Sequence, residues 1–512
     1  MSKLAWQDNL VLLVYIVGMI VLGIWLSRRK RSDDEYFLAG RKMPWFAVGI
    51  SVIASILSSV TYLSEPGEIW KSGVTHISGK MLAIPFEMLF VWLVCIPFLM
   101  KFRFTSVYEY LESRFGNGAR LMGVVLFVML GVLWMGVVVL VTSRVLAHVS
   151  GFHLLTVIGV VGIVATIYTV LGGLRAVIWT DVIQVILLIG GGLFTIGFVI
   201  YSTGTWIPDW FATSTAYLKE KGGAIPTFDL DPFTRATVVT VAINMLVWHV
   251  CTHLSNQMTV QRYFSTSDPR AARRSFLVGS LFGVGINLML MTAGLALLYF
   301  YYGQQVPVDI ELDSEKPNYS LIFPSFAISR LPPGLGGAIL AALLAAAMSS
   351  IDSGVNSIAT VLSVEHRKRR PSSEKNHVKF AMTLTLFAGI FITGVAVLLT
   401  QLPSDWGIID LLPRTFNAIT APLGGLFLIG MFVRRAGQTQ ALTGTLCGLL
   451  TSVAIGYSRE LGLTEKSLSF TLIMPSALIV TVGVAWIISR FGPPPKGALG
   501  GLTWRTRNEP VE

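Results

Sequence analysis

The sequence predicts an all-α membrane protein with about thirteen transmembrane helices. Of its 512 residues, 53% are hydrophobic and 13% are charged, a balance too apolar for soluble domains. Many windows exceed the ~18 apolar residues that a helical span requires. The basic residues cluster between these windows, so the net charge of +11 indicates a membrane protein with basic loops rather than a nucleic-acid-binding protein.

The first apolar segment is predicted to be a retained span. It covers residues 10–26 and is followed by four basic residues at 28–31. A secretory signal has the reverse order, with positive charge before its apolar region. By the positive-inside rule the basic flank is cytoplasmic, so we expect the N-terminus outside.

The later spans follow from apolar windows separated by charged loops. We expect helices near residues 8–27, 44–69, 77–100, 119–148, 153–171, 177–202, 237–257, 274–302, 334–363, 379–400, 407–433, 438–457 and 468–490. Alternating their direction places most of the 39 Lys and Arg residues on one side, together with the C-terminus. This asymmetry predicts that the C-terminus is inside the cell.

Two spans, 44–69 and 237–257, are interrupted by polar residues and lie five spans apart. That offset is typical of two repeats of five helices after one extra N-terminal helix. The expected organisation is an extra helix with a basic loop (1–43), a first repeat (44–203), an external loop (204–236), a second repeat (237–433) containing an external loop (303–333), two peripheral helices (434–490) and a disordered cytoplasmic tail (491–512).

A polar stretch at residues 346–357, AAMSSIDSGVNS, follows an Ala-rich apolar run. At helical spacing, Ser349, Asp352, Ser353 and Asn356 share one face. A carboxylate at membrane depth usually marks an ion pathway, and oxygen ligands without sulfur or imidazole suit a small hard cation. The alternative is that the serines bond to their own helix and Asp352 pairs with a neighbouring helix.

The span at 44–69 loses its apolar character midway, where hydroxyl residues precede Pro66 and Gly67. Proline and glycine among hydroxyl residues favour a helix that breaks and frees backbone groups for ion or solute binding. A tilted, kinked helix with packed Ser and Thr side chains is the simpler alternative.

Several chemistries are excluded by spacing. The segment at 73–81, GVTHISGKM, does not fit a phosphate loop. His249 and His253 have helical metal spacing but no accompanying glutamate in sequence, and Cys95, Cys251 and Cys447 stand singly. We expect no enzyme activity, organic cofactor, nucleic acid or obligatory protein partner.

Six motifs in order carry a family resemblance: DEYFLAGRKMPWFAVGISVIAS (34–55), TSVYEYLESRFG (105–116), GGLRAVIWTDVIQ (172–184), NQMTVQRYFS (256–265), AAAMSSIDSGVNS (345–357) and APLGGLFLIGMF (421–432). With these the chain resembles the sodium:solute symporter family of glucose, proline, pantothenate, sialic acid and monocarboxylate carriers. The resemblance implies a LeuT-type inverted repeat in the plasma membrane, with sodium as the co-transported ion.

The same resemblance implies two cation sites. The first would use Ala54, Leu57, Ala346, Ser349 and Ser350. Some relatives have a second site, whose matching residues are Asp181, Ser349, Asp352 and Ser353. Here Asp352 replaces a hydroxyl of the family pattern, so this position would hold either a second sodium ion or a proton, or pair with a basic residue.

Solute residues follow less directly from the resemblance. Where sugar carriers have an aromatic pair this chain has Thr252 and His253, and their sugar-contacting position becomes His249. A glutamine of the sugar carriers falls near Pro413, beside Arg414. These departures argue against a hexose.

On the second core helix, an ungapped count from Thr61 puts Lys80 where the family that the chain resembles presents a polar solute contact. Lys80, His249 and Arg414 would make an electropositive cavity for a small carboxylate, with Arg414 gripping it bidentately and Ser58 and Thr61 adding hydroxyl contacts. The alternatives are that Lys80 snorkels, Arg414 pairs with Asp410 and His249 is a buried structural histidine.

The favoured function is sodium-coupled symport of a small organic solute, with a carboxylate as the hypothesis for its cargo. The alternatives are a sodium/sugar cotransporter and, from another class, a solute sensor or receptor on the same fold. A channel or an intramembrane enzyme is disfavoured, because no nucleophile and base face each other in the expected spans.

Overall fold

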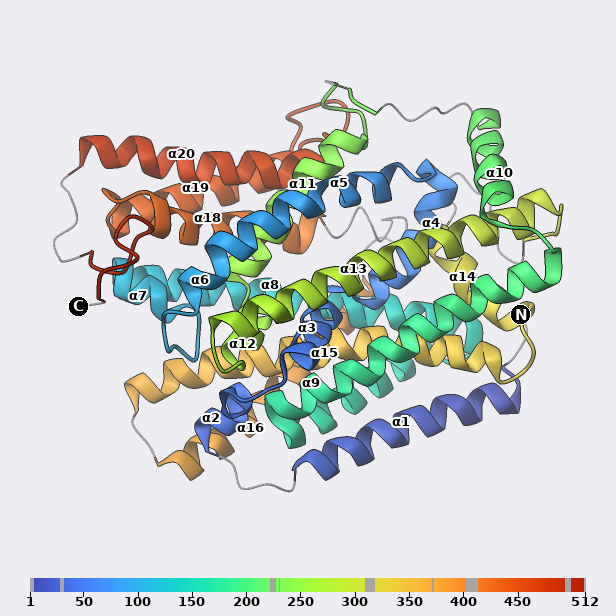
Figure 1. The fold of residues 1–512 in the computed structure, drawn as a ribbon, viewed down its shortest axis with the longest axis horizontal. Helices are drawn as coiled ribbons and strands as arrows, with labels where there is room; N and C mark the ends of the chain where they lie inside the picture. The colour runs from blue at the N-terminus through green and yellow to red at the C-terminus, as the bar shows by residue number, and fades with distance from the viewer. Residues whose placement is uncertain are drawn as a thin grey trace.

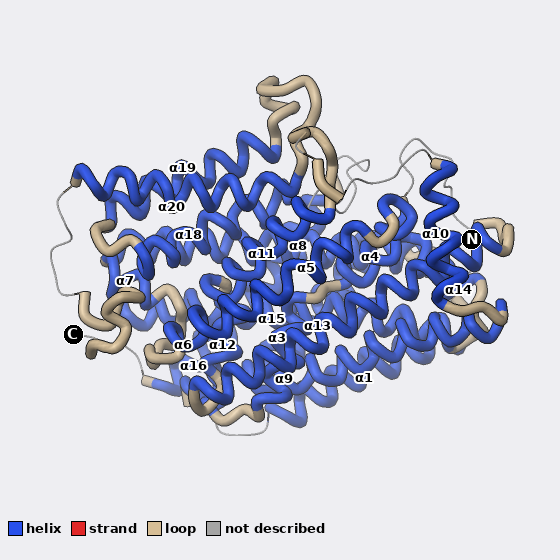
Figure 2. Tube along the Cα trace, turned by 45° about the horizontal axis from the view of Figure 1, so that its top comes forward, coloured by secondary structure: helices blue, strands red, loops and turns tan. Residues whose placement is uncertain are grey.

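The computed structural model describes residues 4–27, 32–221, 227–229, 231–308, 318–370, 373–401, 413–492 and 499–510. Long helices run side by side along one direction, and the two ends of the chain lie at opposite ends of this bundle (Figure 1). Helices account for all the regular secondary structure in these ranges (Figure 2). The predicted all-α class is confirmed.

The helices of the first half precede residue 221. They are α1 (Trp6–Ser27), α2 (Asp33–Leu38), η1 (Ala39–Arg41), α3 (Trp45–Ile56), α4 (Ser59–Ser72), α5 (Thr75–Phe90), η2 (Val91–Cys95), α6 (Ile96–Leu99), α7 (Glu109–Phe115), α8 (Asn117–Ser150), α9 (Leu154–Thr203) and α10 (Ile207–Glu220).

The second half contains the other long helices of the bundle. They are α11 (Val238–Ser255), α12 (Gln257–Phe264), α13 (Pro269–Leu298), η3 (Tyr299–Gly303), η4 (Tyr319–Leu321), α14 (Ile322–Ser329), α15 (Leu335–Arg369), α16 (Glu374–Leu399), η5 (Pro413–Asn417), α18 (Ala418–Phe432), α19 (Gln438–Gly456), η6 (Phe470–Leu472) and α20 (Ile473–Phe491).

Helix α15 lies at the centre of the bundle. Its residues from Gly336 to Thr360 are almost all buried, and α1, α8, α9 and α16 pack around it. The Ala-rich run at 341–347 presents small side chains, which lets neighbouring helices approach closely without a large residue between them. The polar residues that follow on α15 are therefore held inside protein rather than facing lipid.

Eleven described helices are long and apolar enough to cross a membrane. Two segments account for the difference from the expected thirteen. Helix α9 spans both predicted helices 153–171 and 177–202 and bends at Gly173, whose φ of 62° is outside the helical region. The predicted span 44–69 is divided into α3 and α4, each too short to cross alone. The count and the orientation of the termini stay predictions.

The C-terminal tail, residues 491–512, was predicted to be disordered, but part of it is ordered. Residues 499–510 fold back onto the bundle, where Leu502 and Thr503 are buried. The Lys101 Nζ donates to the carbonyls of Gly501 and Arg507, both at 2.7 Å, and the Trp504 N–H donates to the Met431 carbonyl at 2.9 Å. This part of the tail covers the end of the bundle near α7.

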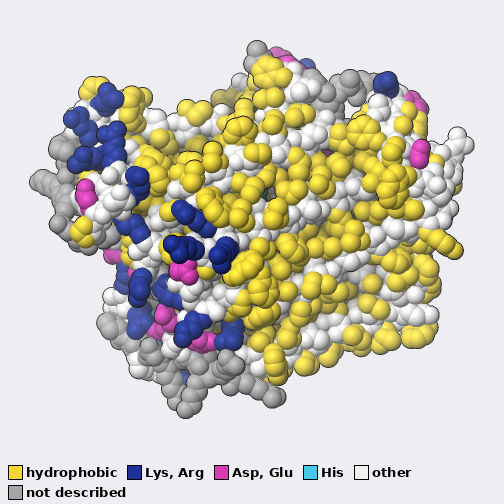
Figure 3. Space-filling view, in the orientation of Figure 1, with side chains coloured by type: hydrophobic (Ala, Val, Ile, Leu, Met, Phe, Trp, Pro, Cys, Tyr) yellow, Lys and Arg dark blue, Asp and Glu magenta, His cyan; other side chains and the backbone are white. Residues whose placement is uncertain are grey.

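Lysine and arginine side chains gather at that same end on the face shown in Figure 3. There Arg120 bridges Glu112 and Glu365, with nitrogen–oxygen distances of 2.8 and 2.6 Å. Burial raises the pKa of Glu112, but hydrogen bonds from Lys368 and Arg120 outweigh it and leave this pKa below its usual range. The basic end is the end expected to face the cytoplasm.

Candidate ion and solute sites

The first core helix breaks at Leu57 and Ser58, between α3 and α4. Both residues are extended, with φ and ψ of −82° and 118° at Leu57 and −112° and 174° at Ser58. The Leu57 N–H still donates to the Ile53 carbonyl at 2.8 Å. The carbonyls of the following residues, which include Ala54, lack the next-turn N–H and point out of the helix end.

Pro66 and Gly67, which favoured an interruption somewhere in the span 44–69, both lie inside α4. The residue that starts the new helix is Ser58, whose Oγ accepts the Val60 N–H at 3.2 Å. A serine at the N-cap competes with the preceding helix for backbone donors and stabilises the new helix start. The sequence signal for the break was therefore the serine pair at 58 and 59 rather than the proline.

Helix α15 crosses this break with its hydroxyl residues. The Ser349 Oγ donates to the Ala54 carbonyl at 3.1 Å or to the Ala346 carbonyl at 3.0 Å. The Ser350 Oγ is fully buried and has no hydrogen-bond partner among the described residues. Three residues of the predicted first cation site thus lie together, and the next residue of α15, Ser350, has a buried hydroxyl without a partner in the described part of the chain.

An unsatisfied buried hydroxyl is costly, and a bound cation removes the cost by taking its lone pairs. The other ligands of this set are backbone carbonyls and a second hydroxyl, with Leu57 placed in the break itself. Neutral oxygens of this kind suit an alkali ion and offer nothing to a soft metal. The residues present therefore fit sodium.

One turn along α15, the Asp352 carboxylate is completely buried. Its Oδ2 accepts the Tyr168 hydroxyl at 2.9 Å and the Thr180 hydroxyl at 3.5 Å, and its Oδ1 accepts the Ser353 hydroxyl at 3.2 Å. These contacts come from hydroxyls of α9 and α15. The alternative that Asp352 pairs with a basic residue at the cytoplasmic end is not what the structure shows.

The Asp181 carboxylate on α9 lies beside this cluster. Its Oδ2 accepts the Ser51 hydroxyl at 2.5 Å and the Arg262 Nη2 at 3.0 Å. The same Arg262 nitrogen hydrogen-bonds the Ser353 hydroxyl, which links the two carboxylate clusters. Arg262 lies in the quoted motif NQMTVQRYFS, but no sequence pattern indicated that it belongs among the cation-site residues.

The charges of this cluster do not balance. Arg262, Asp181 and Asp352 are all fully buried, so two ionised carboxylates would face one guanidinium. The Asp181 Oδ1 has no hydrogen-bond partner among the described residues. Because an uncompensated buried charge is strongly unfavourable, one more positive charge fits here, as a cation or as a proton.

A central cavity of about 160 Å³ opens between α3, α4, α5, α11 and α13. Of the predicted solute residues, Thr61, Lys80 and His249 line it. Lys80 forms an ion pair with Glu65, and the His249 Nδ1 lies 3.1 Å from the Glu87 Oε1. The cavity is therefore not simply electropositive, since each expected cationic group has a carboxylate beside it.

The other predicted solute residues lie elsewhere. Ser58 is buried as the N-cap of α4, and Thr252 lines a smaller neighbouring cavity of about 20 Å³. Arg414 lines a separate cavity, and its Nη1 lies 2.6 Å from the Glu460 Oε1. Its proposed partner Asp410 falls outside the described residues.

Three cavity residues were missed by sequence reasoning. Asn244, Asn287 and Asn417 all line the central cavity, and each has a buried Oδ1 without a hydrogen-bond partner in the described part of the chain. They come from α11, α13 and η5, so only the folded chain brings them together. Unsatisfied amide oxygens in a cavity wall are suited to accept O–H or N–H donors from a solute.

Comparison with known proteins identifies the family of the chain. Residues 36–448 match the model of the sodium:solute symporter family. The chain is 32% identical to a sodium/sialic acid symporter of Proteus mirabilis (strain HI4320), covering 88% of this chain and 90% of that one. It is 30% identical to a sodium/sialic acid symporter of Aliivibrio fischeri (strain ATCC 700601 / ES114), covering 93% and 92%.

A solved structure gives the same result for the fold. The chain superposes on a sodium-coupled sialic acid symporter in a substrate-bound, outward-open state with a TM-score of 0.85. The identity is 28%, and the match covers 97% of this chain and 100% of that chain.

Proposed function

Because the chain belongs to the sodium:solute symporter family, we propose that it carries a small, hydroxylated carboxylate, with sodium bound where α15 crosses the broken helix. As a member it is a multi-pass plasma-membrane transporter that couples solute uptake to sodium, and it is not an enzyme. The observation that carries the sodium assignment is the contact of Ser349 with Ala54, together with the buried, unpartnered hydroxyl of Ser350 on the same helix.

The first sodium ion is held by the carbonyls of Ala54, Leu57 and Ala346 and the hydroxyls of Ser349 and Ser350. A second cation site consists of Asp181, Ser349, Asp352 and Ser353, where the unbalanced charge of two carboxylates and Arg262 supports a bound cation. A sodium-coupled sialic acid symporter of similar fold is described with a novel sodium site.

The mechanism follows alternating access. Sodium entering from outside binds between α3 and α15 and stabilises the arrangement in which the cavity accepts solute, because the ion bridges the broken helix to the rest of the bundle. Each charge moving through 100 mV supplies ~2.3 kcal/mol. At ~1.4 kcal/mol per tenfold, this corresponds to about 50-fold accumulation for each sodium ion.

The solute class is supported by the cavity wall. Lys80 supplies a cation, shared with Glu65, for a carboxylate. The free oxygens of Asn244, Asn287 and Asn417 supply acceptors for hydroxyl or amide N–H groups. A hydroxylated acid of the acidic-sugar class, such as the sialic acid carried by the symporters named above, uses both. A neutral sugar is the second candidate, because Glu65 already neutralises Lys80.

Replacing Ser350 by Ala tests the sodium site. We expect sodium-driven uptake to be lost while expression and folding are kept, since one ligand is removed from a buried site without adding bulk. Uptake of labelled solute into proteoliposomes across a sodium gradient measures this. The matched variant Ser350→Thr keeps the hydroxyl and should retain a measurable sodium dependence.

An unchanged sodium dependence in Ser350→Ala would show that this hydroxyl is not a ligand.

For the solute, a thermal-shift screen of the purified protein with and without sodium should compare acids with their amides and with neutral sugars. A response confined to neutral sugars would replace the carboxylate assignment by the sugar one. Binding with no counterflow of labelled solute would indicate a receptor instead of a carrier.

A further inference from the structure

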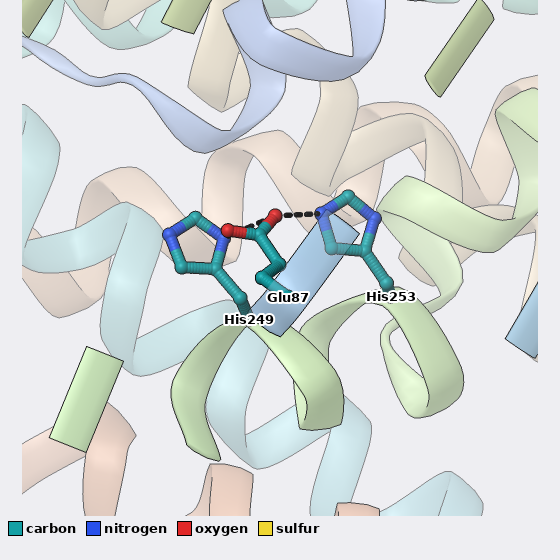
Figure 4. A group of neighbouring side chains, drawn as sticks. All are labelled: Glu87, His249 and His253. Carbon is teal, nitrogen blue, oxygen red and sulfur yellow. Dashed lines mark ion pairs between the residues drawn. The ribbon is translucent and has the colours of Figure 1, made fainter. Parts of the chain in front are cut away.

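Glu87, His249 and His253 converge on one wall of the central cavity. His249 and His253 are four residues apart on α11 and therefore share one face of that helix. Glu87 comes from α5, which packs along α11, and its carboxylate lies between the two rings (Figure 4). The spacing of the two histidines was visible in the sequence, but their carboxylate partner was not, because Glu87 lies more than 160 positions earlier in the chain.

The three side chains have the spacing of metal ligands. The Glu87 Oε1 is 3.1 Å from the His249 Nδ1 and 3.5 Å from the His253 Nε2. All ligand atoms lie within 4.8 Å of one another. A tetrahedral Zn²⁺ at ~2.0–2.2 Å from each ligand holds the ligand atoms roughly 3.3–3.6 Å apart, so small side-chain movements complete the geometry.

The orientation of the His253 ring is fixed by a hydrogen bond at Nδ1, the nitrogen that faces away from Glu87. Its Nδ1 lies 2.7 Å from the Tyr263 hydroxyl, and its ring is 3% exposed. A hydrogen bond at the far nitrogen is the usual support of a metal-bound histidine, because it sets the tautomer and aims the other nitrogen at the metal. His253 Nε2 is thereby directed toward Glu87.

The carboxylate of Glu87 also lacks a permanent cation. It is 4% exposed, and its ion-pair partners among the described residues are the two histidines, which carry charge only when protonated. The His249 Nδ1 is buried and makes no hydrogen bond in the described structure, despite its short distance to Glu87. A divalent ion would satisfy the carboxylate and both nitrogens together.

We propose that Glu87, His249 and His253 bind a divalent transition-metal ion of the Zn²⁺ class, entering from the central cavity. Imidazole favours such ions over sodium, magnesium or calcium, and three protein ligands leave one position open toward the cavity. All three residues line that cavity, so water or a carboxylate oxygen can take the open position. The site is separate from the sodium sites and does not depend on the identity of the solute.

The test is metal binding by the full-length protein, purified without a histidine tag in chelator-treated buffer. Titration calorimetry with ZnCl₂ should give one equivalent of bound zinc per chain, and CoCl₂ should produce the visible absorption of a tetrahedral site. His249→Gln should weaken zinc binding at least tenfold, since it removes a ligand from the most exposed position of the three. Glu87→Gln is the second variant and should do the same.

Two further variants separate this site from adventitious binding. His153→Ala changes an exposed histidine outside the cavity and should leave zinc binding unchanged. Tyr263→Phe removes the support of His253 and should weaken binding about 10- to 100-fold while all three ligands remain. Sodium-induced thermal stabilisation of each variant reports that it is folded.

The proposal is overturned if the wild-type chain binds no zinc, or if His249→Gln and Glu87→Gln bind it as tightly as the wild type. Loss of binding in His153→Ala alone would assign the zinc to the surface. Magnesium chloride at the same concentration should give no heat, and an equal response to magnesium would indicate a hard-cation site instead.

Discussion

The carboxylate of Asp352 stands one helical turn from the first sodium ligands, where the resemblance to the family implies a hydroxyl. Its neighbours Tyr168, Thr180 and Ser353 are hydroxyl donors, and the one guanidinium of the cluster is bonded to Asp181. The extra negative charge is therefore available to a transported cation. We propose that this residue determines how many positive charges accompany each solute molecule.

We expect Asp352→Asn to lower the number of charges carried per solute by one. The amide keeps an oxygen acceptor for Tyr168 but removes the charge that balances the second cation. Accumulation at 100 mV should fall about 50-fold, corresponding to ~2.3 kcal/mol. Reversal potentials in proteoliposomes measure the coupled charge directly.

Tyr168→Phe serves as the control for this prediction. It removes the hydroxyl bonded to Asp352 but leaves the carboxylate, so the coupled charge should be unchanged even if affinity falls. Equal coupled charge in wild type and Asp352→Asn would remove Asp352 from the cation pathway.

Glu65 is the ion-pair partner of Lys80 in the wall of the central cavity, where we propose that the solute binds. Because Glu65 forms an ion pair with Lys80, Glu65→Gln should free this ammonium for a carboxylate. We expect KM for acidic solutes to fall about tenfold, or ~1.4 kcal/mol, relative to their neutral amides. Uptake kinetics for matched acid and amide pairs check this.

Glu68→Gln is the matched variant for that experiment. Glu68 lies one turn further along α4 and pairs with Arg235 at 3.0 Å, away from Lys80. The same loss of charge there should alter acids and amides alike. A similar KM ratio in both variants would mean that Lys80 does not contact the solute.

At the scale of elements, the position of α3 depends on its close crossing with α13. A Cβ on Gly49 would lie 2.9 Å from the Val278 Cβ and closer still to the Ser275 carbonyl. A Cβ on Gly279 would lie 2.9 Å from the Gly49 carbonyl. The two glycines let the helix that carries Ala54 approach α13 backbone to backbone.

Gly49→Ala should destabilise the protein by about 1–3 kcal/mol, because the added methyl group forces α3 away from α13. Gly285→Ala on α13 is the matched control, since nothing lies within 4 Å of its added Cβ. That substitution should be neutral or stabilise by up to ~1 kcal/mol through helix propensity. Thermal unfolding in detergent compares them, and equal behaviour of the two variants would contradict the close crossing.

The features that could be predicted from the sequence are those that depend on local helical periodicity. The shared face of Ser349, Asp352, Ser353 and Asn356 follows from helical spacing, and all four are buried. A break within the span 44–69 was predicted, but Pro66 does not mark its position, because the N-cap at Ser58 starts the new helix. The ion-pair partners of Lys80 and Arg414 could not be predicted from the sequence, because Glu65 and Glu460 come close to them only in the folded chain.

At the scale of the whole molecule, the charged ends define its direction across the membrane. The end near α7 and the folded tail carries clustered Lys and Arg residues on the face in view (Figure 3). At the other end of the bundle, the Tyr302 hydroxyl of η3 contacts Glu220 of α10. By the positive-inside rule we expect the basic end to be cytoplasmic, with the N-terminus outside and the C-terminus inside.

Single introduced cysteines test this orientation. Cys95 and Cys251 are buried and Cys447 is half-buried, so replacing Cys447 by Ser leaves a low background. Gln304→Cys should react with a membrane-impermeant maleimide on intact cells, because Gln304 is exposed at the end opposite the basic residues. Ser113→Cys, exposed on α7, should react only after the cells are permeabilised. The reverse pattern would place the basic end outside, so that an inward sodium gradient would meet the sites from the wrong side.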